Sequence, residues 1–227
     1  MNNNQKKMIA NDAQEDSQLQ LWECIIDSKK EYELIVNGVF IMASYNGLSS
    51  ELLVRNSVKK LNLSDSNILI GGLGMGYSVK EACKYRKELK EIHVVEIEPQ
   101  IIKWNKELLS DLNGKYLTDE RVSVINDDFY QYVYSTNVNY NIVCMDIDNG
   151  PMMLSSENNI KVYSLDFFRQ VKKILMDEAL FVIWSCNEDS TLLSNLRKVF
   201  PNCWVEEVME NHQGTDIAYY LYFTANF

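Results

Sequence analysis

The sequence has few of the residues from which metal sites and nucleic-acid surfaces are built. It contains two histidines that are far apart, His93 and His212, and its five cysteines show no C-x-x-C spacing. Because zinc sites need clustered Cys and His, we expect no bound metal. The chain has 22 Lys and Arg against 32 Asp and Glu, a net charge of −10. This balance argues against nucleic acid as a partner, since phosphate contacts need clustered cations.

Long apolar runs are also missing. No stretch approaches the roughly 20 apolar residues that a membrane-spanning helix needs, so we expect no membrane partner. The polar start MNNNQKK lacks the apolar core of a signal peptide. Cysteines scattered through apolar segments are typical of buried thiols in a reducing compartment. We therefore expect a cytoplasmic protein.

The N-terminal part of the chain predicts a small unit separate from the rest. Residues 1–16 are polar and without periodicity, which is typical of a loosely held tail. Within residues 17–46, two apolar runs flank Asn37-Gly38, which is the strongest short signal for a β-hairpin. We expect Ser49 or Ser50 to cap a helix that leads into the main domain, residues 47–227.

Strand and helix patterns then alternate along the chain. The alternation predicts an α/β fold with a Rossmann-like, doubly wound and mostly parallel sheet. The expected strands are 67–70, 92–95, 122–125, 141–145 and 179–184, followed by two further β runs at 204–209 and 217–223. The expected helices are 79–89, one beginning at Pro99, 162–175 and 192–199.

A glycine cluster separates the strand at 67–70 from the helix that follows. Its members are Gly71, Gly72, Gly74 and Gly76. Glycines at such a turn let a ligand approach the backbone amides at the helix N-terminus. Tyr77 stands where a dinucleotide fingerprint requires a third small residue, and no P-loop motif is present. The cluster therefore favours a nucleoside without a pyrophosphate over NAD, although an ordinary strand-to-helix turn stays open.

Acidic residues follow the next strands. Glu96, with Ile97 beside it, comes about 20 residues after the glycines, where a carboxylate accepts hydrogen bonds from ribose hydroxyls. Asp127 is placed to accept from an adenine amino group, because a carboxylate accepts from an exocyclic N–H. Its neighbour Asp128 is either part of this site or a helix N-cap. These strand ends predict a nucleoside site at one edge of the sheet.

The segment Asp146-Ile147-Asp148-Asn149-Gly150-Pro151 is the candidate for chemistry. Two carboxylates separated by one residue can hold or deprotonate an amine while it attacks an electrophilic carbon. By position Asp146 lies nearest the reacting end of the ligand, and it is the expected base, with Asp148 beside it. A polar turn that covers the site without taking part in catalysis is the alternative.

Five segments together resemble the spermidine and spermine synthases, the polyamine aminopropyltransferases, within the class I S-adenosylmethionine-dependent methyltransferase fold. They are ILIGGLGMG, HVVEIEP, RVSVINDDF, YNIVCMDIDNGP and the helix after VYSLDFF. The resemblance implies that Gly72 and Gly74 line the donor, that Glu96 binds the ribose and Asp127 the adenine, and that Asp146 is the acid/base residue. It also implies decarboxylated S-adenosylmethionine as donor, a small-molecule amine as acceptor and methylthioadenosine as product.

The chain departs from this family at three positions. Gly74 stands where the family usually carries an acidic residue for the donor's terminal amine. Ser49-Ser50-Glu51 replaces its Tyr-His-Glu, and Asp148 is one residue closer to Asp146 than the family's second carboxylate. Methyl transfer from S-adenosylmethionine to a small molecule or peptide therefore stays open, as does non-catalytic nucleoside binding. Whether the hairpin edge pairs with a second subunit in a homodimer is also open.

Overall fold

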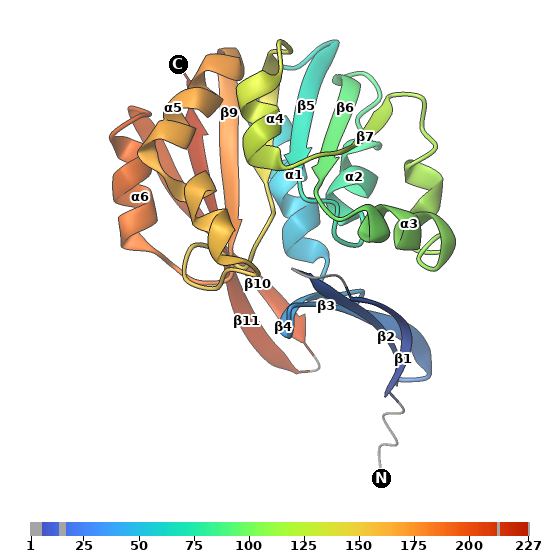
Figure 1. The fold of residues 1–227 in the computed structure, drawn as a ribbon. Helices are drawn as coiled ribbons and strands as arrows, with labels where there is room; N and C mark the ends of the chain where they lie inside the picture. Colours follow the sequence, from blue (N-terminus) through green and yellow to red (C-terminus); the bar gives the residue numbers. More distant parts are fainter. Residues whose placement is uncertain (1–5, 14–16, 213, 227) are drawn as a thin grey trace.

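The computed structural model describes residues 6–13, 17–212 and 214–226. Its main feature is a twisted seven-stranded sheet with helices on both faces (Figure 1). In order across the sheet, the strands are β10 (Asn202–His212), β11 (Thr215–Ala225), β9 (Leu175–Ser185), β8 (Tyr140–Met145), β5 (Ser66–Gly71), β6 (Leu89–Glu96) and β7 (Val122–Asn126).

The strand pairing confirms the predicted doubly wound sheet. Strands β9, β8, β5, β6 and β7 are parallel, and β10 and β11 form an antiparallel hairpin beside β9. The chain starts at β5 and winds outward through β6 and β7, then returns to β8 on the other side of β5. In such sheets the crevice at the carboxyl ends of the two strands where the order reverses is the usual ligand site. Here those strands are β5 and β8.

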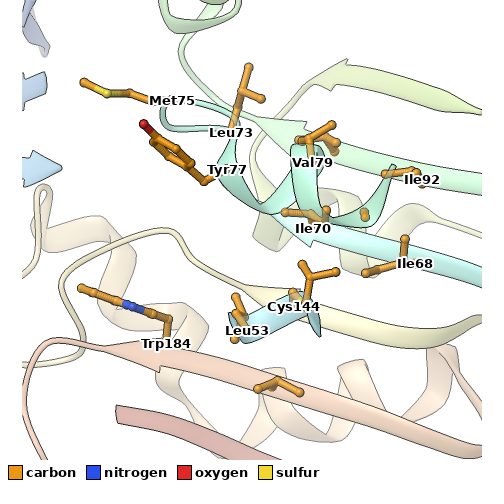
Figure 2. Close-up of a cluster of buried hydrophobic side chains, with 14 of the residues drawn as sticks. Leu53, Ile68, Ile70, Leu73, Met75, Tyr77, Val79, Ile92, Cys144 and Trp184 are labelled. Atoms are coloured by element: carbon orange, nitrogen blue, oxygen red, sulfur yellow. The ribbon is translucent and has the colours of Figure 1, made fainter. Parts of the chain in front are cut away.

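Alternating residues of the parallel strands face two separate layers of helices. Ile68 and Ile70 of β5 belong to the apolar cluster under one layer, whereas Leu69 between them belongs to the cluster under the other. Figure 2 shows the first cluster, with Ile68, Ile70 and Val79 packed together. That layer contains α1 (Leu48–Lys60), α2 (Tyr77–Ala82) and α3 (Pro99–Glu107), and the other contains α4 (Phe129–Ser135), α5 (Leu165–Ile174) and α6 (Ser190–Arg197). Two short 3₁₀ helices span Gly114–Tyr116 and Glu157–Tyr163.

A second, four-stranded antiparallel sheet precedes the main one. It consists of β1 (Lys6–Ala13), β2 (Gln18–Ile26), β3 (Lys29–Val36) and β4 (Val39–Ala43). The turn between β3 and β4 has φ angles of 51° at Asn37 and 78° at Gly38. Positive φ at both positions is the requirement of a type I′ turn, which confirms the hairpin predicted from Asn-Gly.

The expected polar tail at residues 1–16 is wrong for residues 6–13. These form β1, which pairs with β2 through the backbone along most of its length. The side chains of an edge strand can stay polar because its stability comes from main-chain hydrogen bonds on one side, so the sequence carries little apolar signal. Residues 1–5 and 14–16 lie outside the described residues.

Two helix boundaries also differ from expectation. Helix α1 has Gly47 rather than a serine at its N-cap, and Ser49 and Ser50 are buried inside it. The Leu48 N–H instead donates to Oε1 of Glu210 on β10, at 2.9 Å. Helix α2 ends at Ala82 instead of continuing to residue 89 as expected. The chain turns after it, and Leu89 begins β6.

The four-stranded sheet lies at the carboxyl-end edge of the main sheet (Figure 1). The Asn149 side-chain amide, after β8, donates to the Phe40 carbonyl oxygen at 2.9 Å. The Tyr77 hydroxyl, at the start of α2, donates to the Ser44 carbonyl oxygen at 2.6 Å. These contacts hold β4 and the residues after it over the crevice between β5 and β8.

Candidate active site

A cavity of about 920 Å³ lies between the carboxyl ends of the main strands and the β4 hairpin. Cavities that bind small molecules commonly have volumes of roughly 300–1,000 Å³. Most of the expected site residues line it, namely Gly72, Gly74, Glu96, Ile97, Asp128, Asp146 and Asp148. Gly71, Gly76 and Asp127 are not in its wall.

Gly72 is the glycine that the crevice requires most. It has a φ of 92°, and a Cβ atom there would overlap the carbonyl oxygen of Asp146. The Gly72 N–H donates to the Val95 carbonyl oxygen at 2.9 Å, so the turn is fixed between the ends of β6 and β8. Only a residue without a side chain lets these two strand ends meet the turn at this separation.

Gly74 faces the N-terminal sheet. It has a φ of 50°, and a Cβ atom there would stand 2.6 Å from the sulfur of Met42 on β4. Met42 also lines the cavity, and its sulfur accepts a hydrogen bond from the Met75 N–H at 3.1 Å. A thioether therefore lies where an acidic side chain at position 74 would project.

Gly71 and Gly76 serve packing around the turn. A Cβ atom on Gly71 would stand 2.7 Å from the ring of Phe129. Gly76 is the left-handed N-cap of α2, and a Cβ atom there would stand 3.0 Å from Asn113. Both glycines shape the turn, and neither presents a surface to the cavity.

Glu96 is a buried carboxylate at the end of β6 that faces the cavity. Its two oxygens accept hydrogen bonds from the N–H groups of Leu73 and Glu98, both at 2.9 Å. Burial raises the pKa of Glu96, and these backbone donors oppose the rise. Each carboxylate oxygen can accept a further bond, which leaves Glu96 free to accept from two neighbouring hydroxyls of a ligand.

The two acidic residues after β7 have different positions. Asp128 is the N-cap of α4, with one oxygen accepting from the Tyr130 N–H at 2.8 Å and the other 2.6 Å from Nζ of Lys161. The predicted N-cap role is therefore confirmed, and Asp128 lines the cavity as well. Asp127 accepts from the Asp128 N–H at 2.8 Å and lies outside the wall. The neighbour of the expected adenine residue, rather than that residue itself, lines the cavity.

Asp146 follows β8 and lies at the centre of the crevice. Burial raises its pKa to about 6, against the opposing effect of hydrogen bonds from Ser50 and Ser78. Those serines belong to α1 and α2. A carboxylate with a pKa of about 6 is ionised at neutral pH and can accept a proton there.

Asp148 holds the loop that follows β8. One of its oxygens accepts from the N–H of Ser155 at 2.8 Å and from the Ser155 hydroxyl, and the other accepts from the Asn159 side-chain amide at 2.7 Å. These bonds tie residues 148–159 into one turn beside the cavity. Although Asp148 lies in the cavity wall, its hydrogen bonds indicate that it shapes the loop.

Sequence reasoning missed the residues that more distant elements contribute. Met42 comes from β4, Trp184 from β9 and Tyr219 from β11, and all three line the cavity. The rings of Trp184 and Tyr219 lie 5.2 Å apart between centroids. In Figure 2 the rings of Tyr77 and Trp184 extend the same way, away from Ile68 and Ile92. An apolar strand pattern gives no signal that one of its residues faces a cavity.

Within residues 6–13, 17–212 and 214–226, no group of three or more His, Cys, Asp and Glu side chains is placed to hold a metal ion. None of the helices in this same part of the chain has the length and apolar content to cross a membrane.

The chain was compared with protein families and with curated proteins. The family model described as spermine/spermidine synthase domain matches residues 48–206. The polyamine aminopropyltransferase of Sulfolobus acidocaldarius is 31% identical over 63% of this chain and 48% of its own length. That of Prochlorococcus marinus strain MIT 9312 is 29% identical over 66% of this chain and 53% of its own. The chain thus spans about half the length of these relatives.

Comparison with solved structures gave similar folds. A spermidine synthase in complex with the transition-state analogue AdoDATO has a TM-score of 0.81 and 13% identity, over 97% of this chain and 74% of that one. The spermidine synthase of Thermotoga maritima has a TM-score of 0.78, also at 13% identity, over 97% and 73% of the two chains. The likeness confirms the predicted class I methyltransferase type of fold.

Proposed function

Because the chain belongs to the spermine/spermidine synthase family, we propose that it transfers an aminopropyl group from decarboxylated S-adenosylmethionine to an amine. One observation carries the proposal. The carboxylates of Glu96, which is buried, and Asp146, which is half-buried, line a single cavity, at the ends of strands on either side of the Gly72 turn. Glu96 is suited to accept hydrogen bonds from the ribose hydroxyls. Asp146 is suited to accept a proton at the reacting end of the donor.

The donor occupies the side of the cavity that β5, β6 and β7 form. Glu96 accepts hydrogen bonds from the ribose, and the Gly72 and Gly74 turn lies along the nucleoside. For the adenine, Asp128 lies in the cavity wall, whereas the expected Asp127 lies outside it and accepts from the Asp128 N–H. This arrangement directs the sulfonium toward Asp146 at the centre of the crevice.

The chemical step is a displacement at the carbon attached to the positive sulfur. The acceptor nitrogen forms a bond to that carbon while the carbon–sulfur bond breaks, and its electron pair stays on sulfur in methylthioadenosine. Asp146 accepts the proton that the nitrogen loses. The protein contributes mainly by holding nitrogen, carbon and sulfur in line.

Methyl transfer from S-adenosylmethionine is the second candidate, and one observation favours it. The sulfur of Met42 lies against Gly74, so no carboxylate is present there for the terminal amine of a decarboxylated donor. The two donors differ by one carboxylate group. A site without an acidic residue at position 74 repels the carboxylate of S-adenosylmethionine less than a site that has one.

Calorimetric titration of the protein with each donor tests the proposal. We expect decarboxylated S-adenosylmethionine to bind more tightly, and methylthioadenosine to form when an amine is added. Tighter binding of S-adenosylmethionine would favour methyl transfer. Donor binding without turnover of any acceptor would favour a nucleoside-binding protein, and binding of neither donor would contradict the nucleoside site itself.

The proposal includes three expectations about the setting. We expect a cytoplasmic protein without a nucleic-acid partner, which the net charge of −10 supports. We also expect pairing with a second copy through the N-terminal sheet, because the backbone of an edge strand is open to pairing. Sedimentation of the purified protein tests the homodimer.

A further inference from the structure

The cavity extends beyond Glu96 toward the outer strand β7. Across the carboxyl ends of the main sheet, the order β8, β5, β6, β7 places Asp146, Gly72, Glu96 and Asp128 in a row (Figure 1). With the reacting end of the donor at Asp146 and the ribose at Glu96, the base extends toward Asp128. We call this part of the cavity, between the ends of β6 and β7 and the 3₁₀ helix Glu157–Tyr163, the base end.

Apolar side chains in the wall of the base end can pack against an aromatic base. Ile97, which follows Glu96, lies in the wall and is 55% exposed. Phe129 of α4 and Val162 of the 3₁₀ helix also line the wall, and both are buried. A flat base that covers Ile97 would remove apolar surface from water, which is favourable. The base end is therefore suited to a nucleobase.

Lys161 brings a positive charge into the base end. The other charged side chains in the wall are all acidic, namely Glu96, Glu98, Asp128, Asp146 and Asp148. Lys161 is the single cation among the wall residues that the structure describes. Its Nζ atom lies 2.6 Å from Oδ2 of Asp128 and 4.9 Å from the centroid of the Tyr130 ring. The carboxylate and the ring together fix the ammonium beside the base.

The ion pair with Asp128 does not by itself account for a lysine at this position. The side chains of Lys161 and Asp128 are 35% and 27% exposed, and ion pairs in contact with water contribute little to stability. Asp128 caps α4 through its other oxygen, which accepts from the Tyr130 N–H. An ammonium carries three N–H donors, and Asp128 needs one of them. The remaining donors of Lys161 can serve a ligand in the cavity.

Adenine is complementary to this pair of side chains. Its exocyclic amino group donates hydrogen bonds, and the ring nitrogens N1 and N7, on either side of that group, accept them. A carboxylate beside an ammonium offers one acceptor and one donor, as an asparagine amide does when it binds adenine through two hydrogen bonds. Asp128 can thus accept from the amino group while Lys161 donates to a ring nitrogen.

We propose that Lys161 determines the specificity for the base, by donating a hydrogen bond from its ammonium to N1 or N7 of the adenine. Asp128 both holds the ammonium in place and accepts from the amino group of the same base. This inference rests on the proposed function, since it assigns a further residue to the donor site.

Calorimetry on the full chain tests the inference with three nucleosides. They are methylthioadenosine and its 7-deaza and 1-deaza analogues, in which a C–H group replaces N7 or N1. We expect one of the analogues to bind about tenfold or more weakly than methylthioadenosine, because it lacks the acceptor for a charge-assisted hydrogen bond. The analogue that loses affinity identifies the nitrogen that Lys161 contacts.

Three variants isolate the ammonium. Lys161→Met keeps an unbranched side chain without the charge, so methylthioadenosine and the weaker analogue should bind with nearly the same affinity. Lys161→Arg keeps a cationic donor and should retain the preference for methylthioadenosine. Lys172→Met is the matched control, because Lys172 donates to the Val199 carbonyl oxygen at 3.0 Å, lies 5.6 Å from the centroid of the Phe200 ring and is outside the cavity wall. It should leave all three affinities unchanged.

The outcomes separate this inference from the proposed function. If both analogues bind as tightly as methylthioadenosine, the ammonium does not contact the base, and the transferase proposal stands without it. A preference that persists in Lys161→Met would assign the ring nitrogen to another donor, and an equal loss for all three nucleosides would give the lysine a structural role only. Either result would overturn the inference. Failure of methylthioadenosine itself to bind would overturn the proposed function, and the role of Lys161 would fall with it.

Discussion

The backbone of Gly72 passes so close to Asp146 that a Cβ atom on the glycine would overlap the aspartate's carbonyl oxygen. The Asp146 N–H in turn donates to the carbonyl oxygen of Gly71 at 2.9 Å. The donor turn and the expected base are therefore one rigid unit at the ends of β5 and β8. A change in the backbone of the glycine turn therefore moves Asp146, and a change at Asp146 moves the turn.

We expect Gly72→Ala to destabilise the protein and to abolish donor binding. The alanine would have a φ of 92° and overlap the backbone of Asp146, and neither problem can be relieved by a side-chain movement. Gly38→Ala is the matched control, because Gly38 has a φ of 78° and open space around its Cβ position. Left-handed strain alone costs about 1–2 kcal/mol, and thermal unfolding should show a clearly larger loss for Gly72→Ala. Equal losses would mean that the strand ends can separate.

Asp146→Asn should abolish turnover and leave donor affinity nearly unchanged. The amide has almost the same shape but cannot accept the proton from the acceptor nitrogen. In the unchanged protein, kcat/KM should rise about tenfold per pH unit below pH 6 and level off above it, since the pKa of Asp146 is about 6. Steady-state rates measure the turnover and its pH dependence, and calorimetric titration with the donor measures the donor affinity. A large loss of donor affinity in this variant would place Asp146 at the donor instead.

The same substitution should stabilise the fold at neutral pH. The pKa of Asp146 is raised from 3.8 to about 6, so the folded state holds its proton more tightly than the unfolded state. The associated stability is present below pH 3.8 and is lost as pH rises through 6. Asp146→Asn should therefore be more stable than the unchanged protein at pH 8, by at most about 3 kcal/mol, and the difference should vanish near pH 4. Thermal unfolding across this range provides the measurement, and a difference that does not depend on pH would refute the assigned cause.

Asp148→Asn should have the opposite effect on stability. Its carboxylate accepts from three donors on Ser155 and Asn159, and an amide group presents a donor to at least one of them. Leaving a buried donor unpaired costs about 1–3 kcal/mol. We expect a lower melting temperature for Asp148→Asn and a higher one for Asp146→Asn at pH 8. Loss of turnover in Asp148→Asn without loss of stability would instead support a direct role in catalysis.

The parts of the fold that the sequence predicted well depend on local signals. The apolar runs ending at Gly71, Glu96 and Met145 became parallel strands, and Asn37-Gly38 became the expected turn. Such elements are specified by residues within a few positions of each other. The strand order then placed Glu96 and Asp146 at one edge of the sheet, as strand ends of a doubly wound fold require.

The parts that could not be predicted depend on distant pairing. β1 exists because β2 offers it an edge, and its own residues give little apolar pattern. Met42 reaches the glycine turn only because the hairpin folds over the crevice, and Glu210 serves the start of α1 from a strand near the end of the chain. Asp127 and Asp128 are adjacent, so a shift of one residue at the end of β7 decides which of them lines the cavity, and propensity does not resolve such a shift.

The absence of an acidic residue at position 74 can be reversed to test where the donor's tail lies. We expect Gly74→Asp combined with Met42→Ala to raise the affinity for decarboxylated S-adenosylmethionine about tenfold, through a charge-assisted hydrogen bond to its terminal amine. Removing the Met42 sulfur, 2.6 Å from the new Cβ position, makes room, and aspartate tolerates a φ of 50°. Gly74→Asn with Met42→Ala is the control, because it has the same size without the charge. Calorimetry should show this gain only in the double variant that contains aspartate, and only with the decarboxylated donor. Equal affinities of the two double variants for that donor would mean that the donor's tail lies away from Gly74.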